Sequence, residues 1–345
     1  MSESLIQNFN HLKIHSQYSI CEGAVKIDDL QDFSKTNKLK SLGLCDTSNL
    51  CGALEFAEKI SKVGTQPIIG TQINFKYGDC IGLLPLFALN EEGYKRIIKL
   101  SSISFLENDE LSDPHVDFKD LLDDNTGVAV FSGTIFGLFG ELYNKGKFSD
   151  VLDLYKRLKL NFGDRFYIEI QRHNDQNESG FEKFNLNKSL ELEIPIIATN
   201  EVFYLNKDMH EAHDALICIG NKTYVNEKSR TRLSNQHYFK NNSEMTELFA
   251  DIPEALENNY KFPLRCNFRP LFSKPILPNI SSEKGGNADD VLKKDSLHGL
   301  SIKFDKIFGI KSNELANNKK YIDYKDRLDH ELSIIIDNSW SNLSL

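Results

Sequence analysis

Hydrophobic positions along the chain form short apolar runs that alternate with longer segments of helical period. The short runs have the length and β-branched content of strands, and we predict strands at 11–15, 41–45, 67–75, 81–89, 127–133, 166–170 and 195–199. Between them, apolar residues recur on one helical face in the segments 49–64, 90–106 and 148–163. This alternation is typical of βα units around a parallel sheet, and seven or so such units favour a barrel over an open sheet.

The pattern changes after about Pro263. Residues 265–287 are rich in Pro, Ser, Asn and Gly, which indicates a boundary or an extended connection. Beyond it, amphipathic helices are predicted at 288–300 and 323–336. This second unit has too few residues to bury a core by itself.

Composition and charge limit the classes of protein to which this chain could belong. Hydrophobic residues make up 40% and charged residues 26% of the 345 positions, which is typical of a globular protein. The net charge of −9 argues against a general basic surface for nucleic acid. The six cysteines form no CxxC pair, so we expect reduced thiols in a cytoplasmic protein. No signal peptide or membrane span is evident.

The first predicted strand carries the most chemically distinctive residues. His11, Lys13 and His15 alternate, so on a strand their side chains project from one face. Two imidazoles on one face could begin a site for Zn, Mn or Fe, whereas the Lys13 ammonium repels a divalent cation and could supply the positive charge itself. The spacing alone leaves open a metal site and an ordinary hydrogen-bonded pair.

Longer segments show a family resemblance. HLKIHSQYSICEGAVKIDDL and LGLCDTSNLCGALEFAEKISKVGTQPIIGTQINF resemble the opening of the polymerase-and-histidinol-phosphatase (PHP) domain of bacterial DNA polymerase III alpha subunits, which are replicative, C-family DNA polymerases. FYIEIQRH, IPIIATNEVFYL and SEMTELFADIPEALENN resemble later parts of the same family, in the same order. The resemblance implies an α/β fold: a PHP-type distorted (β/α)7 barrel at 8–275. Residues 276–345 would then be a linker and the truncated, mostly helical start of the polymerase palm and thumb region.

The resemblance also implies where a PHP metal cluster would be held. Four matching positions keep a residue that could ligate, namely His15, Glu22, His173 and Glu201. Five have changed, namely Lys13, Thr47, Gln72, Leu83 and Phe203. We therefore expect a degenerate pocket held by hydrogen bonds and a lysine–carboxylate pair, with no catalytic residue and no metal. Outside these positions His115, His237, His298 and His330 show no grouping, and His213 is expected to pack or cap.

As a function, the resemblance implies part of the alpha subunit acting in chromosome replication. The PHP domain would be a docking platform for the proofreading exonuclease subunit and other holoenzyme subunits. DNA and Mg would be bound only through a polymerase core whose carboxylates lie beyond residue 345. Because the final DNSWSNLSL departs from the family pattern, we expect a truncated, frame-altered or split reading frame. The alternatives are a Zn- or Mn-dependent phosphoesterase or 3′-5′ exonuclease at the residual site, and a free-standing PHP phosphatase.

Overall fold

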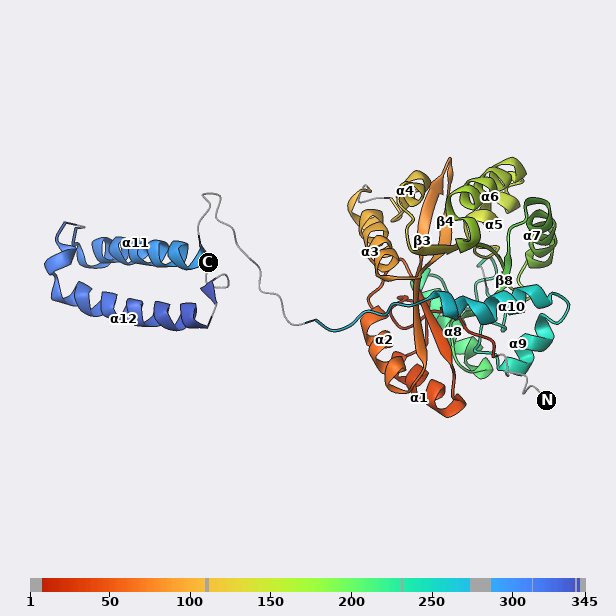
Figure 1. Cartoon of the computed structure of the whole chain (residues 1–345), viewed down its shortest axis with the longest axis horizontal. Coiled ribbons are helices and arrows are strands. Elements are labelled where there is room, and N and C mark those ends of the chain that lie inside the picture. Colours follow the sequence, from red (N-terminus) through yellow and green to blue (C-terminus); the bar gives the residue numbers. More distant parts are fainter. Residues whose placement is uncertain are drawn as a thin grey trace. The chain divides into compact units, whose positions relative to one another are not determined.

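Strands and helices alternate through the first 272 residues of the computed structural model, as the hydrophobic pattern predicts (Figure 1). The structure describes residues 8–108, 112–230, 232–273, 287–311, 313–338 and 340–341. It divides into two units, Met1–Phe272 and Ser273–Leu345. None of the helices in the described ranges is long and apolar enough to cross a membrane.

The first unit contains all the strands of the described chain. These are β1 (Lys13–Ile14), β2 (Ser41–Thr47), β3 (Gln66–Tyr77), β4 (Cys80–Ala88), β5 (Val116–Asp117), β6 (Val128–Phe131), β7 (Phe166–Ile170), β8 (Ile196–Ala198) and β9 (Glu201–Val202). The larger, mixed sheet has the order β2-β3-β4-β6-β7-β8, with β5 added beside β3, and curls into a half-barrel. A separate parallel pair is formed by β1 and β9.

Helices lie around these strands (Figure 1). They are α1 (Ile27–Asn37), α2 (Ala53–Lys62), α3 (Glu91–Leu106), α4 (Phe118–Asp123), α5 (Leu138–Asn144), α6 (Phe148–Phe162), α7 (Glu178–Leu192), α8 (His210–Gly220), α9 (Asn242–Leu248) and α10 (Pro253–Lys261). Short 3-10 turns occur at Gly163–Arg165, Lys207–Met209 and Phe262–Arg265. The predicted α/β PHP-type fold class is confirmed.

One strand departs from the predicted βα alternation. β4 pairs antiparallel with both β3 and β6, so it follows β3 as a hairpin and not through a helix. The turn consists of Gly78 and Asp79, and Gly78 has a φ of 61°, which glycine adopts without the strain of a Cβ. The half-barrel is therefore mixed, not wholly parallel.

Packing explains the helices and brings β1 close to the sheet. The long helix α6, for example, buries an apolar stripe of Val151, Leu154 and Leu158 in the main hydrophobic core. At Gly43 of β2 a Cβ would collide with the Leu12 carbonyl oxygen. Only glycine allows this approach, in which the Gly43 N–H donates to the His11 carbonyl at 2.7 Å. The backbone around Lys13 is thereby held beside β2.

The described part of the second unit is helical. It contains α11 (Ala288–Phe308), a 3-10 turn at Leu315–Asn317 and α12 (Lys319–Asp337), both helices being longer than predicted. Phe304 is buried and packs edge-on against Tyr321 of α12, with ring centroids 5.1 Å apart. The assignment of residues 276–345 to a linker and the start of a polymerase core stays a prediction.

Candidate functional site

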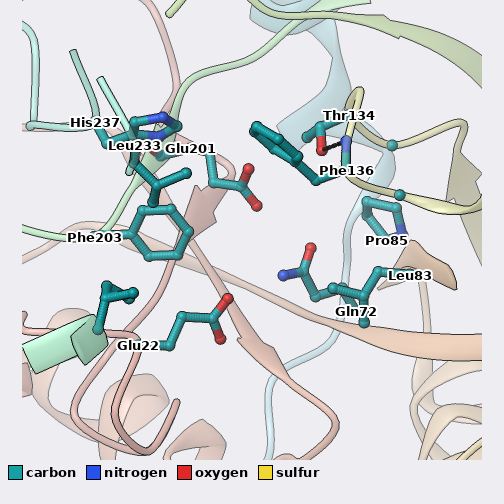
Figure 2. Close-up of a pocket in the computed structure, with 13 residues that line it drawn as sticks. Glu22, Gln72, Leu83, Pro85, Thr134, Phe136, Glu201, Phe203, Leu233 and His237 are labelled. Carbon is teal, nitrogen blue, oxygen red and sulfur yellow. Dashed lines mark hydrogen bonds between the residues drawn. The ribbon is translucent and has the colours of Figure 1, made fainter. Parts of the chain in front are cut away.

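A pocket of about 190 Å³ opens in the first unit, among residues from several strand ends and loops. Five of the nine positions singled out in the sequence line it, namely Glu22, Gln72, Leu83, Glu201 and Phe203 (Figure 2). The ends of barrel strands are where side chains from different βα units converge, which explains the meeting of residues so distant in sequence.

Lys13 forms an ion pair with Glu201, one of the residues that line the pocket. In the parallel β1–β9 pair Lys13 is in register with Glu201, so the two side chains leave the same face. Lys13 Nζ lies 3.0 Å from Glu201 Oε1 and 3.7 Å from Glu169 Oε1, and the lysine side chain is fully buried. Burial alone would lower the pKa of Lys13, but the two carboxylates outweigh it and raise that pKa. The ammonium is therefore held in its charged form.

His15 contacts the same carboxylate. Its Nε2 lies 3.0 Å from Glu201 Oε1, and its ring stacks on Phe203 with centroids 4.5 Å apart. Burial raises the pKa of Glu201, but Lys13 and the His15 hydrogen bond outweigh burial and hold that pKa well below its usual range. Phe203, at a position where the family resemblance implies a ligand, is here the stacking partner of the histidine. The expected lysine–carboxylate pair is thus present.

Thr47, Gln72 and Leu83 complete the replaced positions. Thr47 and Gln72 are register partners in β2 and β3, and Gln72 Nε2 donates to Thr47 Oγ1 at 3.1 Å. Leu83 of β4 adds an apolar wall to the pocket. The Lys13 ammonium beside Glu201 would repel a metal cation, and the side chains of Leu83 and Phe203 have no atom that can bind a metal. These residues do not fit the multi-metal cluster that the family resemblance implies.

Glu22 lies on a loop that Asp46 holds in place. The buried Asp46 carboxylate accepts from the Ser16 N–H at 2.6 Å and from the Ser19 hydroxyl at 2.7 Å. His213 Nε2 lies 2.8 Å from the Glu22 carbonyl oxygen, which fixes the other side of the loop and fits the packing role expected of this histidine. Among the described residues the Glu22 carboxylate has no hydrogen-bond or ion-pair partner, and it faces the pocket (Figure 2).

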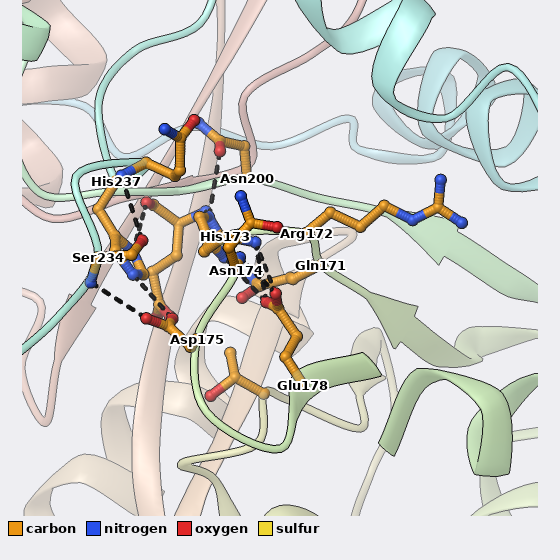
Figure 3. A network of polar contacts seen from close by, with 12 residues as sticks. Gln171, Arg172, His173, Asn174, Asp175, Glu178, Asn200, Ser234 and His237 are labelled. Carbon is orange, nitrogen blue, oxygen red and sulfur yellow. Dashed lines mark hydrogen bonds and ion pairs between the residues drawn. The ribbon is translucent and has the colours of Figure 1, made fainter. Parts of the chain in front are cut away.

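Beside the pocket lies a cluster that the sequence did not predict (Figure 3). His173, Asp175 and His237 offer ligand atoms within 4.8 Å of one another. His237 Nε2 lies 3.0 Å from Asp175 Oδ2, and the rings of His173 and His237 stack at 4.1 Å with an angle of 6° between their planes. The expectation that His237 belongs to no group is wrong, because the fold brings it to His173.

The present geometry of this cluster favours hydrogen bonding over metal binding. An imidazole ligates through a lone pair in its ring plane, and two nearly parallel rings direct their lone pairs along separate planes. His173 Nε2 also accepts the Glu201 N–H at 3.2 Å. Burial and the neighbouring His237 lower the pKa of His173 well below its usual value. A single divalent ion would need one of the two rings to turn.

Comparison with known proteins places the chain in a family. The PHP domain family model matches residues 11–173. DNA polymerase III subunit alpha of Caulobacter vibrioides is 33% identical over 348 residues, covering 97% of this chain and 29% of that protein. The same subunit of Rickettsia conorii is 36% identical over 332 residues, covering 95% of this chain and 28% of that protein. The chain thus spans less than a third of the length of these relatives.

A solved structure gives a more distant match. A two-domain protein of Bacteroides vulgatus, described as containing a predicted PHP-like metal-dependent phosphoesterase, is 14% identical with a TM-score of 0.37. That match covers 69% of this chain and 62% of the other, and it adds nothing to the assignment. The sequence matches support the family assignment. This chain belongs to the bacterial DNA polymerase III alpha subunit family and contains that family's PHP domain.

Proposed function

We propose that this chain acts in bacterial chromosome replication, in the cytoplasm, as the PHP-containing part of a DNA polymerase III alpha subunit. Its PHP domain is a structural and docking domain, not a hydrolase. Nucleotide transfer with Mg belongs, in this proposal, to the polymerase core of the longer family members. The proofreading exonuclease subunit and other holoenzyme subunits are the proposed partners.

The observation that carries the proposal is the buried Lys13 ion pair. Lys13 Nζ contacts Glu201 at 3.0 Å, and Glu201 is one of the few retained carboxylates that could ligate a metal. A metal ion at this carboxylate would have to approach a fixed ammonium, which costs Coulomb energy in a site of low polarity. The Lys13 ammonium instead stabilises the buried carboxylates of the half-barrel. In this proposal it supplies the positive charge that a metal would otherwise supply.

The absence of hydrolysis can be tested directly. The purified chain is incubated with Mn²⁺ or Zn²⁺, desalted and analysed for bound metal, and then assayed on bis-p-nitrophenyl phosphate and on single-stranded DNA. We expect no stoichiometric metal and no turnover above that of a His15→Ala variant. Stoichiometric metal, with hydrolysis that His15→Ala abolishes, would contradict the proposal.

Docking is a separate measurement. The net charge of −9 suits a protein partner better than a phosphate backbone and supports this part of the proposal. The chain and the purified proofreading exonuclease subunit of the same organism are run together and separately by size-exclusion chromatography. We expect a shared, earlier peak that an unrelated acidic protein does not produce. Separate elution of the two proteins would reject the docking role.

The alternative, a metal-dependent phosphoesterase or 3′-5′ exonuclease, rests on the proximity of His173, Asp175 and His237, which could hold one ion if one of the two imidazole rings turned. The metal analysis above tests it as well. If a single Zn²⁺ or Mn²⁺ is bound and is lost on His237→Ala, this second cluster holds the ion. Hydrolysis that disappears in the same variant would then assign the activity to it.

A further inference from the structure

Hydrogen-bond acceptors of several side chains face the interior of the pocket drawn in Figure 2. The side chains of Glu22, Gln72 and Glu201 converge on its interior from three separate segments (Figure 2). Gln72 and Glu201 are only 3% and 5% exposed, so both residues belong to the interior of the first unit and not to its outer surface. Two carboxylates and an amide oxygen can accept hydrogen bonds from a ligand.

These acceptors are only partly used within the protein. Lys13 and His15 both contact Oε1 of Glu201, and its Oε2 accepts no hydrogen bond from a described residue. Gln72 uses its Nε2 toward Thr47, while its Oε1 has no hydrogen-bond partner in the described part of the chain. Neither oxygen is among the fully buried unpaired side-chain atoms of the described chain, so both keep some solvent access and can accept from a ligand in the pocket. The arrangement therefore favours a ligand that brings donors.

The charge around the pocket is negative. Lys13 balances the carboxylate of Glu201, and burial raises the pKa of Glu169, which favours the neutral form of that group. Glu22 adds a carboxylate that no described cation balances. The other polar lining groups are occupied: His237 faces Asp175, and the Thr134 hydroxyl accepts the Phe136 N–H. A singly charged cation held mainly by Glu22 would relieve this imbalance, and Lys13 would repel it less than it repels a divalent metal ion at Glu201.

The walls are apolar and aromatic. Phe136 and Phe203 line the pocket on different sides, together with Leu83, Pro85 and Leu233 (Figure 2). Aromatic faces attract organic cations, and apolar walls suit a short hydrocarbon chain. The volume of about 190 Å³ is below the range of about 300–1,000 Å³ found for drug-sized ligands, so the ligand is small.

We propose that this pocket binds a primary alkylammonium group, with Glu22, Gln72 and Glu201 accepting its three N–H donors and Phe203 and Phe136 flanking its alkyl chain. An ammonium is compact and carries three donors and no acceptor, which matches three convergent acceptors. Mg²⁺ would instead demand near-octahedral oxygen ligands, whereas much of this lining is apolar. The proposal stands apart from any docking role.

The group can come from a small free amine or from a lysine side chain of a protein. Calorimetric titration of the whole chain with 1,4-diaminobutane tests the first source, and titration with N-acetyl-lysine methylamide tests the second. We expect the diamine to bind with a Kd of about 1 mM or tighter. Butan-1-ol, in which a neutral hydroxyl replaces the ammonium, should not bind, and this control requires no variant to fold.

The Glu22→Gln variant removes the unbalanced charge with little change of shape. It should weaken diamine binding by about tenfold, as expected for a lost charge-assisted hydrogen bond. Glu247→Gln, on the exposed side of α9, is the matched control and should bind like the wild type.

Saturable binding of either amine that Glu22→Gln weakens supports the proposal, and binding by the lysine derivative alone assigns the ammonium to a protein partner. No binding of either amine, equal binding of butan-1-ol, or displacement of the amine by stoichiometric Mn²⁺ would overturn it.

Discussion

Lys13 is the buried cation that lies between two carboxylates in the interior of the half-barrel. Replacing it by methionine keeps the length of the side chain but leaves Glu201 and Glu169 without their shared cation. Removal of one partner from a buried ion pair costs about 3–5 kcal/mol, because a charge stays behind unpaired. We expect Lys13→Met to lower the free energy of unfolding by this amount in urea denaturation. Lys62→Met, which removes an exposed ion pair with Glu58, should cost no more than about 1 kcal/mol. Equal effects of the two substitutions would contradict the assigned role.

Residues close in sequence were easier to predict as a site than residues brought together by the fold. The alternation of Lys13 and His15 indicated one shared face, and both side chains do contact Glu201. Asp175 and His237 are 62 positions apart, and no spacing rule links them. Their meeting depends on the path of the loop after α8, which hydrophobic periodicity does not describe.

Strongly periodic elements were predicted closely, because burial of one face dictates both their type and their extent. The predicted strand at 166–170 coincides with β7, and the predicted helix at 148–163 differs from α6 by one residue. The predicted parallel direction is wrong for β4, since an apolar run has the same pattern whichever way the strand runs. The signal that would have identified the β3–β4 hairpin is the Gly78-Asp79 pair between two apolar runs. Such two-residue turns join antiparallel neighbours.

Across the whole molecule, the buried ionisable groups described above lie in the first unit. Burial lowers the pKa of His11 to about 3, and it lowers the pKa of His213 to about 4. Glu178 acts in the opposite direction, because burial raises its pKa to about 7. In the second unit the fully or nearly buried side chains of the described residues are Leu292, Phe304, Leu315, Leu332 and Ser341, which do not titrate. A pH dependence of stability from these groups therefore belongs to the first unit.

The sign of the His11 contribution follows from the two pKa values. Between pH 6.5, the ordinary value, and about 3, the unfolded chain binds a proton at His11 that the folded chain does not. The contribution is fully present above pH 6.5 and is lost progressively as the pH falls toward 3. From about pH 7 to about pH 5 this group alone should remove roughly 2 kcal/mol of stability.

Because Glu178 partly offsets the total, the informative quantity is the difference between variants. We expect the loss of stability over this interval to be roughly 2 kcal/mol smaller in His11→Gln than in the wild type. Urea unfolding followed by far-ultraviolet circular dichroism measures it, since the single tryptophan, Trp340, reports on the second unit. The wild-type pH dependence in His11→Gln would show that His11 is not buried in its neutral form.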